Sequence, residues 1–292
     1  MNRLLTGLHV PLITPFTADA ALDPGSLETL AHRVLEAGAA GLVALGTTAE
    51  APVLTAAERA TVLDICVAAC REHAAALIAG AGGNDTAASA RELAALARWP
   101  EVTAALVVVP YYSRPGEAGV VAHFAELSAA SPVPLVMYNI PFRTGQAVSW
   151  QAVCELAARQ AIAGVKHSPG AIDNDTIALM AHRPDDFAVL AGDDAHASAM
   201  LALGASGTIS ASANVCPAEF AGLVRGWQSG DASQARAIGH RVSVLSAALF
   251  AEPNPAVIKG VLHAQGRIPS PAVRLPLLSA GQDTVGAALG LC

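Results

Sequence analysis

The hexapeptide Ala-Ile-Ala-Gly-Val-Lys at residues 161–166 is a short apolar run that ends in a lysine. It follows a second apolar run, Pro-Leu-Val-Met-Tyr at residues 134–138, which ends in a tyrosine. Lys166 and Lys259 are the only lysines of the chain, and a lysine that closes a buried strand is costly unless it is neutral, paired or catalytic. A desolvated amine at the mouth of a barrel is a nucleophile suited to ketones.

Short apolar runs like these two recur along the chain and alternate with segments whose apolar residues have helical spacing. The expected strands are residues 8–13, 41–45, 76–79, 105–109, 135–138, 163–166, 188–190 and 207–210. Eight such βα units in about 210 residues are typical of an α/β fold, the (β/α)8 TIM barrel. A doubly wound sheet is the alternative, but no glycine-rich phosphate-binding turn follows the first run.

Helix starts and the C-terminal third complete the predicted organisation. Residues of the N-cap type precede the first three helices: Asp23, then Thr55 with Glu58 as a capping box, then Asn84 or Asp85. After residue 210 the expected helices are 218–228, 232–250, 256–265 and 284–289, with no strand between them. We therefore predict a barrel over residues 1–226 and a C-terminal helical domain over residues 227–292.

Composition excludes several classes of partner. The net charge is −7 with a pI near 5.7, and no basic stripe is available for nucleic acid. Apolar residues make up 53%, yet no run is long enough to predict a transmembrane helix or a signal peptide. The five cysteines are scattered and have no zinc-binding spacing, which favours reduced thiols in a cytoplasmic protein without a metal. Charged residues are only 14%, which hints that part of the surface is covered in an oligomer.

The residues at the predicted strand ends indicate Schiff-base chemistry, because the active site of a barrel lies at the carboxyl ends of its strands. A lysine, three tyrosines and several hydroxyl groups gather there without a metal-ligand cluster. A neutral lysine can attack a ketone, a tyrosine can shuttle protons, and hydroxyl groups can hold a carboxylate, with no cofactor required. The residues concerned are Thr47, Thr48, Tyr111, Tyr112, Tyr138 and Lys166.

Each of these residues also has a structural interpretation. Lys166 alone suits a structural ion pair better than catalysis, and Tyr138 one strand earlier is what favours catalysis. The two threonines suit a helix cap, and the paired tyrosines suit a core or an interface. Asp193 and Asp194 suit structural hydrogen bonds better than acid–base catalysis, and His167 suits a hydrogen-bonded wall position better than a base.

Five motifs, in order along the chain, resemble the dihydrodipicolinate synthase family. That family belongs with N-acetylneuraminate lyase to a superfamily of class I aldolases. The motifs lie at residues 110–115 (Pro-Tyr-Tyr-Ser-Arg-Pro), 138–145 (Tyr-Asn-Ile-Pro-Phe-Arg-Thr-Gly), 164–166 (Gly-Val-Lys), 192–194 (Gly-Asp-Asp) and 252–255 (Glu-Pro-Asn-Pro). The resemblance covers nearly the whole chain and implies condensation of pyruvate with an aldehyde.

The resemblance also implies roles for individual residues. Lys166 resembles the lysine that forms the imine with pyruvate, and Tyr138 resembles the proton-relay tyrosine. Thr47 resembles the residue that bridges Tyr138 to Tyr112, which a neighbouring subunit would supply. The expected substrate-binding residues are Thr48, which would hold a carboxylate, Arg143 at the pocket mouth, and the main chain at Gly192 and Ile209.

Two departures from the family pattern leave the second substrate open. Ala49 stands where the synthase usually has a glycine, and His167 stands where a glutamate usually follows the lysine. Arg143 favours aspartate semialdehyde, because the sialic-acid and sugar-acid branches usually lack this arginine. The alternatives are another pyruvate-dependent aldolase or 2-oxo-acid dehydratase, and a non-catalytic ligand-binding barrel.

The resemblance further implies a homotetramer built from two tight dimers, with Tyr111 and Tyr112 at the tight interface. Many bacterial synthases are inhibited by lysine bound at that interface. Here Arg59 stands where a histidine is common and Ala88 stands where a carboxylate would pair with the lysine ammonium. We therefore expect no inhibition by lysine.

Overall fold

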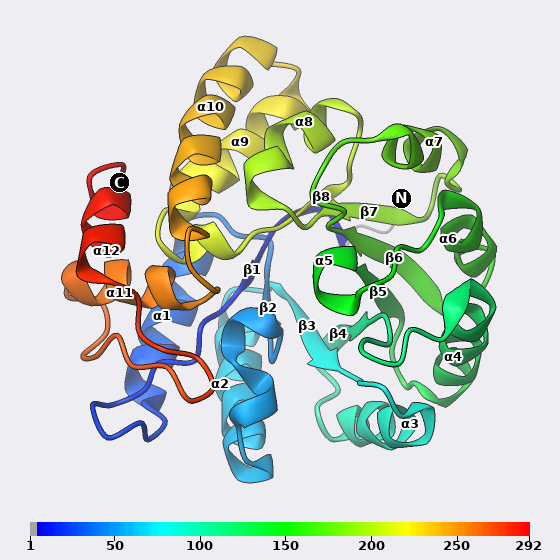
Figure 1. The fold of residues 1–292 in the computed structure, drawn as a ribbon, viewed down its shortest axis with the longest axis horizontal. Coiled ribbons are helices and arrows are strands. Elements are labelled where there is room, and N and C mark those ends of the chain that lie inside the picture. The colour runs from blue at the N-terminus through cyan, green and yellow to red at the C-terminus, as the bar shows by residue number, and fades with distance from the viewer. Residues whose placement is uncertain (1–4) are drawn as a thin grey trace.

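Eight parallel strands close into a barrel in chain order, with β1 paired to both β2 and β8 (Figure 1). This architecture is that of a computed structural model, which describes residues 5–292. The strands are β1 (Gly7–Pro11), β2 (Gly41–Ala44), β3 (Ala76–Ala81), β4 (Val102–Val108), β5 (Leu135–Asn139), β6 (Ile162–His167), β7 (Ala188–Ala191) and β8 (Gly207–Ile209). The predicted (β/α)8 TIM barrel is confirmed, and each of the expected runs contributes one strand.

The strands are apolar on both faces because both faces are buried. One cluster of side chains, which includes Val43, Ile78 and Leu190, fills the inside of the barrel. A larger cluster joins the outer faces of the strands to the surrounding helices. Parallel strands covered on both sides appear in the sequence as continuous apolar runs rather than alternating ones.

Helices connect the strands and form the outer layer. They are α1 (Pro24–Glu36), α2 (Ala56–Glu72), α3 (Thr86–Ala95), α4 (Gly116–Ala130), α5 (Pro141–Thr144), α6 (Trp150–Ala157), α7 (Asn174–His182), α8 (Ala197–Ala202) and α9 (Pro217–Ser229). The predicted caps form: Asp23 accepts from the Ser26 amide, and Thr55 forms the capping box with Glu58. At the third helix the cap is Asp85 rather than Asn84, and it accepts from the Ala88 amide.

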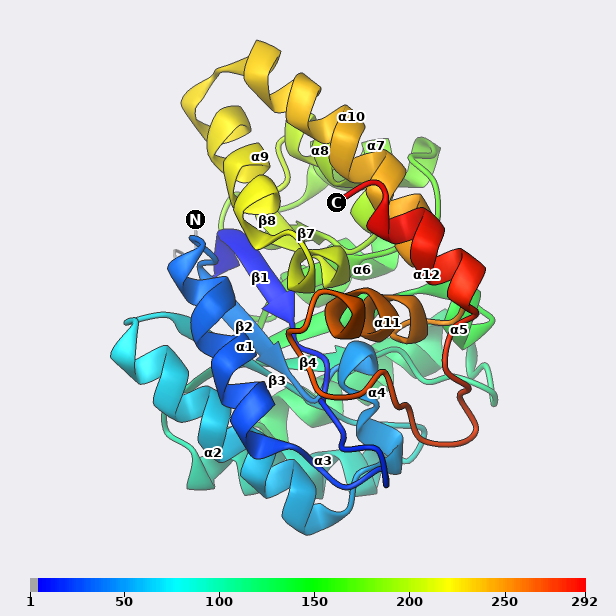
Figure 2. The same cartoon turned by 90° about the vertical axis from the view of Figure 1, so that its left-hand side faces the viewer.

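Three further helices follow α9, as predicted: α10 (Ala232–Leu249), α11 (Ala256–Ala264) and α12 (Gln282–Leu289). They lie on one side of the barrel, where α10 packs against α8 and α9 and α12 packs against α10 and α11 (Figure 2). The expected domain boundary between residues 226 and 227 falls within α9. The division into a barrel and a separate helical domain stays a prediction.

Within residues 5–292, no helix combines the length and the apolar character needed to cross a lipid bilayer.

Candidate active site

Lys166 and Tyr138 lie side by side inside the barrel. They are register partners on the adjacent parallel strands β6 and β5, so both side chains point to the same face of the sheet. The Nζ atom of Lys166 is 4.2 Å from the centre of the Tyr138 ring, and each residue is only 7% exposed. The two strand-end residues singled out in the sequence are thus brought together by the sheet register.

A small cavity of about 50 Å³ opens beside the Lys166 amine. It is lined by residues from five different strand ends and from the C-terminal segment. Among them are all the sequence-predicted site residues except Tyr112, namely Thr47, Thr48, Tyr138, Arg143, Lys166, Gly192 and Ile209. The barrel therefore brings these side chains to one cavity, although they are spread over more than half of the sequence.

Gly192 is required by its closeness to the lysine. A Cβ atom at this position would lie 2.8 Å from Cγ and 2.9 Å from Cε of Lys166, and it would also clash with the Ser168 hydroxyl. Carbon atoms do not approach so closely without displacement of one of them. The absence of a side chain at residue 192 leaves the Lys166 chain free to extend into the cavity.

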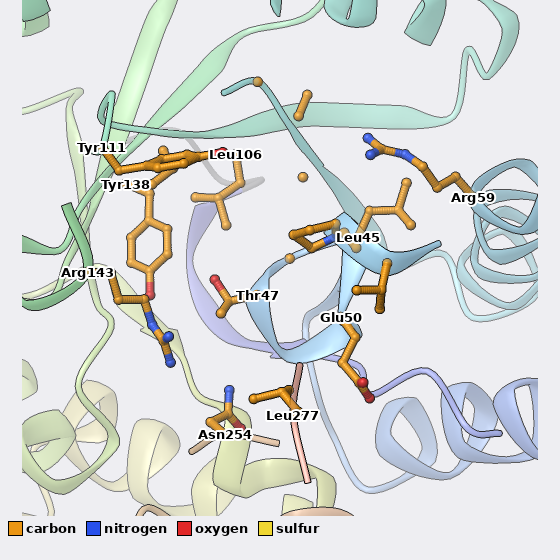
Figure 3. Close-up of a pocket in the computed structure, with 18 of the residues that line it drawn as sticks. Leu45, Thr47, Glu50, Arg59, Leu106, Tyr111, Tyr138, Arg143, Asn254 and Leu277 are labelled. Atoms are coloured by element: carbon orange, nitrogen blue, oxygen red, sulfur yellow. The ribbon is translucent and has the colours of Figure 1, made fainter. Parts of the chain in front are cut away.

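The two threonines stand on a short 3₁₀ turn, Thr47–Ala49, directly after β2. Thr14, three residues beyond β1, holds this turn, because its hydroxyl donates to the Ala49 carbonyl at 2.7 Å. Thr48 is buried, and its Oγ1 accepts a hydrogen bond from Nδ2 of Asn254 at 3.0 Å. Thr47 is exposed to the cavity side, and Figure 3 shows its hydroxyl pointing into the same space as that of Tyr138.

A larger cavity of about 520 Å³ adjoins the small one (Figure 3). The two cavities share Thr47, Tyr138, Arg143 and Asn254 in their walls. Arg143 is exposed on the short helix α5 and carries a cationic guanidinium at this shared boundary. The arrangement offers a narrow inner space next to the lysine and a wide outer space suited to a second, anionic reactant.

Tyr112 is the one predicted site residue that lines neither cavity. It is 92% exposed and its φ of 64° lies in the left-handed region, which a tyrosine rarely adopts. Its neighbour Tyr111 does line the larger cavity, and the Tyr111 amide donates to Oδ1 of Asn84 at 2.8 Å. Within a single chain, Tyr112 is therefore not brought to the lysine.

Asp193 and Asp194 lie beside the small cavity but are engaged in hydrogen bonds. Asp194 accepts from the Ala211 amide at 3.2 Å and the Ser212 amide at 2.6 Å, and Asp193 accepts from the Gly170 amide at 2.8 Å. Burial raises the pKa of both carboxyl groups, an effect that these hydrogen bonds and the Lys166 charge oppose. Both residues hold the loops around Lys166 in place.

His167 points away from the cavities, because successive side chains of a strand alternate between faces. Its Nε2 is hydrogen bonded to the Thr176 hydroxyl of α7 at 3.1 Å, and that hydroxyl donates to Asp173. Burial lowers the pKa of His167 to about 4, against the opposing effect of two nearby aspartates. The imidazole faces α7 and lines neither cavity, so His167 is not in a position to act as a base on a substrate.

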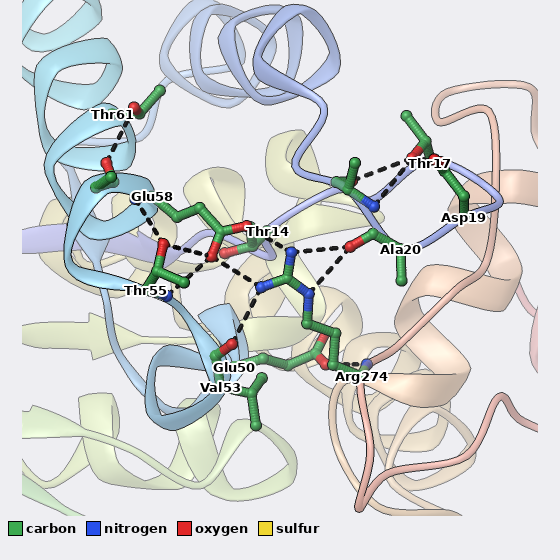
Figure 4. Close-up of polar contacts among 12 residues, drawn as sticks. Thr14, Thr17, Asp19, Ala20, Glu50, Val53, Thr55, Glu58, Thr61 and Arg274 are labelled. Atoms are coloured by element: carbon green, nitrogen blue, oxygen red, sulfur yellow. Dashed lines mark hydrogen bonds and ion pairs between the residues drawn. The ribbon is translucent and has the colours of Figure 1, made fainter.

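A charged cluster fixes the loop that carries the threonines to the C-terminal segment (Figure 4). Nζ of Lys259 on α11 donates to Glu50 at 2.5 Å, and the Arg274 amide donates to the other Glu50 oxygen at 2.9 Å. The Arg274 guanidinium binds Glu58 and holds the pKa of that carboxyl at about 2. Burial lowers the pKa of Lys259 to about 8, an effect that Glu50 opposes.

Sequence reasoning included Asn254 in a family motif without assigning it a role, and it missed the Glu50–Lys259 pair. The rarity of lysine in the chain was a signal for Lys259, since its side chain is fully buried in α11. No local pattern, however, identified Glu50 as its partner. In the part of the chain that the structure describes, no group of three or more His, Cys, Asp or Glu side chains is placed to hold a metal ion.

Comparison with known proteins places this architecture in one family. The sequence matches the Dihydrodipicolinate synthetase family over residues 4–287. The 4-hydroxy-tetrahydrodipicolinate synthase of Moorella thermoacetica is 38% identical over 282 residues, which cover 97% of this chain and 94% of that protein.

Solved structures agree with the sequence comparison. The chloride-inhibited dihydrodipicolinate synthase of Acinetobacter baumannii, solved in complex with pyruvate, has a TM-score of 0.93 and 31% identity, covering 98% of this chain and 97% of its own. A dihydrodipicolinate synthase variant described as monomeric has a TM-score of 0.94 and 30% identity, covering 99% and 96%. The chain belongs to the dihydrodipicolinate synthetase family.

Proposed function

We propose that this protein is a class I lyase that condenses pyruvate with aspartate semialdehyde, in the manner of a 4-hydroxy-tetrahydrodipicolinate synthase. The observation that carries the proposal is the buried Lys166 amine, 4.2 Å from the Tyr138 ring at the edge of a small cavity. A lysine amine that opens onto a cavity of this size can reach the ketone carbon of a small 2-oxo acid.

The first half of the reaction uses the inner cavity. Nζ of Lys166 attacks the ketone carbon of pyruvate, and the resulting carbinolamine loses water to give an imine. Tyr138 supplies a proton to the departing hydroxyl group and later accepts one when C3 of the imine is deprotonated to an enamine. Thr48 and the main chain at Gly192 and Ile209 surround the carboxylate and the imine.

The second half uses the outer cavity. The enamine carbon attacks the aldehyde of the second substrate, whose carboxylate pairs with Arg143 at the boundary between the cavities. The amino group of aspartate semialdehyde then attacks the imine carbon, closes the ring and releases the Lys166 amine. No metal or cofactor is needed for these steps.

The alternative of another pyruvate-dependent aldolase or a 2-oxo-acid dehydratase was motivated by Ala49 and His167. His167 contacts α7 and lines neither cavity, so it does not support a different second substrate. Ala49 is buried in the turn after β2 and leaves the alternative open. An aldehyde panel assayed with pyruvate distinguishes the two proposals.

We also propose a cytoplasmic homotetramer, a dimer of dimers, in which Tyr112 completes the site of a neighbouring subunit. Its 92% exposure and left-handed backbone support this, because a strained and fully exposed aromatic residue is suited to burial against a second copy. Thr47 would then relay protons between Tyr138 and the partner subunit's Tyr112.

Borohydride trapping tests the proposed function. Wild-type protein reduced in the presence of pyruvate gains the mass of one reduced pyruvate, and peptide mapping places it on Lys166. Because Lys259 is the only other lysine, the map has to distinguish only two side-chain amines. An unmodified wild type, or a Lys166→Ala variant that still gains the mass, contradicts the proposal.

A further inference from the structure

Asn254 extends the candidate site into the C-terminal segment, to which no role was assigned from the sequence. It lies between α10 and α11, is 7% exposed, and lines both cavities (Figure 3). Its Nδ2 donates to Oγ1 of Thr48 at 3.0 Å. Its Oδ1 is buried and has no hydrogen-bond partner among residues 5–292.

We propose that Asn254 is a positioning residue that makes the Thr48 hydroxyl a hydrogen-bond donor to the carboxylate of bound pyruvate. The inference rests on the proposed function and names a residue that it needs. A hydroxyl group has one proton to donate, whereas its oxygen can accept, and an amide NH2 group can only donate. Because Asn254 donates to the Thr48 oxygen, the Thr48 proton is left for another acceptor.

The Thr48 proton is available to a carboxylate that binds in the small cavity. Thr48 is 3% exposed, lines this cavity and makes no other side-chain hydrogen bond among the described residues. A carboxylate accepts only, so it matches a hydroxyl whose oxygen is already engaged. Hydrogen bonds to a charged group are also stronger than neutral ones, which makes this proton a useful contact for a 2-oxo acid.

A second contact keeps the two segments in register. The Lys259–Glu50 ion pair joins α11, which follows Asn254, to the residue two positions after Thr48. Both partners of this pair are almost fully buried, with side-chain exposures of 0% and 1%. The Asn254 amide and the Thr48 hydroxyl are therefore held together by this ion pair as well as by their own hydrogen bond.

The test is a double-mutant cycle on pyruvate binding, measured as the half-saturating pyruvate concentration for borohydride trapping. Asn254→Ala and Thr48→Val are each expected to raise this concentration about 10- to 100-fold, the scale of a lost hydrogen bond to a charged group. The double variant is expected to match Thr48→Val alone, because Asn254 acts through Thr48. Fully additive effects, or an unchanged value in Asn254→Ala, overturn the inference.

Asn254→Asp provides a pH readout that a merely structural role would not produce. At neutral pH its carboxylate accepts the Thr48 proton and repels pyruvate, whereas its protonated form donates to Thr48 as the amide does. Because burial raises the pKa of a carboxyl group above its ordinary value near 3.9, the half-saturating concentration in this variant is expected to fall, relative to wild type, as the pH is lowered from about 7 towards about 4. If the half-saturating concentration of Asn254→Asp follows that of wild type over this pH range, the inference is contradicted. Aspartate has the same shape as asparagine, so this test can be made even if Asn254→Ala does not fold.

Glu252→Ala is the matched control. It removes a different hydrogen bond from the segment between α10 and α11 that carries Asn254, and so tests whether a general loss of order in that segment weakens pyruvate binding. Glu252 accepts from the Gly281 amide at 3.0 Å and forms no hydrogen bond with Thr48 among the described residues. Its half-saturating pyruvate concentration is expected to stay within about twofold of wild type; a rise as large as that of Asn254→Ala would show a structural effect and overturn the inference. A wild type that traps no pyruvate overturns the proposed function as well, whereas a wild type that traps it with an unaffected Asn254→Ala overturns this inference alone.

Discussion

Lys166 and Tyr138 occupy matching positions on adjacent strands, so the amine lies 4.2 Å from the centre of the phenol ring. This closeness places the tyrosine beside the point where an imine would form. Neither a helix pair nor a loop contact is needed to maintain it, because the main-chain hydrogen bonds of the sheet set the register.

Tyr138→Phe is expected to keep the fold and to lower turnover by about 10²- to 10⁴-fold, the usual contribution of an acid–base group. Thr47→Val is expected to act similarly, because it removes the hydroxyl without removing volume. Steady-state kinetics with pyruvate and the aldehyde measure both. Thr61→Val on α2, where the hydroxyl bonds only the Ala57 carbonyl, is the control, and turnover near wild type in Tyr138→Phe and Thr47→Val would exclude the relay.

Gly192→Ala is expected to slow formation of the pyruvate adduct by about 10²-fold, because the new methyl group displaces the Lys166 side chain from its position. The rate of mass gain under borohydride measures this. Gly286→Ala, a glycine in α12 with no atom within 4 Å of the added Cβ, is the matched control. Equal adduct rates in the two variants would show that the closeness of residue 192 to the lysine has no consequence.

The Arg274–Glu58 contact is expected to contribute stability that depends on pH. The folded-state pKa of Glu58 is lowered to about 2 from an ordinary value of 4.5, mainly by the Arg274 hydrogen bond. A depressed carboxyl pKa adds stability that is present above pH 4.5 and is lost as the pH falls towards 2. Urea unfolding of Glu58→Gln should therefore show a deficit at pH 7 that shrinks below pH 4.5.

Glutamine can retain the capping box through its carbonyl oxygen, so this variant removes the charge and one of the two oxygens that accept from Arg274. Arg274→Met should show a deficit with the same pH dependence, because it removes the other half of the contact. A deficit in Glu58→Gln that is constant from pH 7 to pH 3 would contradict the assignment.

The protein is expected to form a homotetramer of four 29.5 kDa chains, with Tyr111 and Tyr112 in the tighter interface. Light scattering at assay concentration measures the mass. Tyr112→Asp should shift the population towards smaller species, because it places a charge where an aromatic side chain would be buried. A monomeric wild type would refute the assembly and the sharing of Tyr112.

L-Lysine is not expected to inhibit the enzyme. The Arg59 guanidinium pairs with Glu92, whose other oxygen accepts from the Gly82 amide at 2.7 Å, so this carboxylate is already engaged. Ala88 offers no charge to a ligand ammonium, and the missing hydrogen bond is worth about 1.5–3 kcal/mol, or ten- to a hundredfold in affinity. Half-inhibition below about 1 mM lysine in the condensation assay would contradict this expectation.

Much of the fold follows from local features of the sequence. Each barrel strand is buried on both faces, so it leaves a continuous apolar run such as residues 161–166. The caps at Asp23 and Thr55 are also local, because each side chain bonds an amide three residues away. For the same reason the strand-end positions of Lys166 and Tyr138 were visible without coordinates.

His167 shows where local reasoning ends. In the sequence it is as close to the presumed reaction centre as a residue can be. The alternation of the strand turns it to the outer face, where α7 and burial determine its partner and its protonation. Adjacency in the sequence therefore said nothing about access to the cavity.

The barrel, the order of its strand ends and the candidate lysine could be predicted from the sequence, because these depend on residues within one element. The distant residues that complete the candidate site become visible only in the folded chain. Asn254 meets Thr48 across 206 positions and Lys259 meets Glu50 across 209. Such contacts arise when the C-terminal helices pack onto the barrel, and the burial that then requires each polar group to find a partner leaves no periodic pattern in the chain.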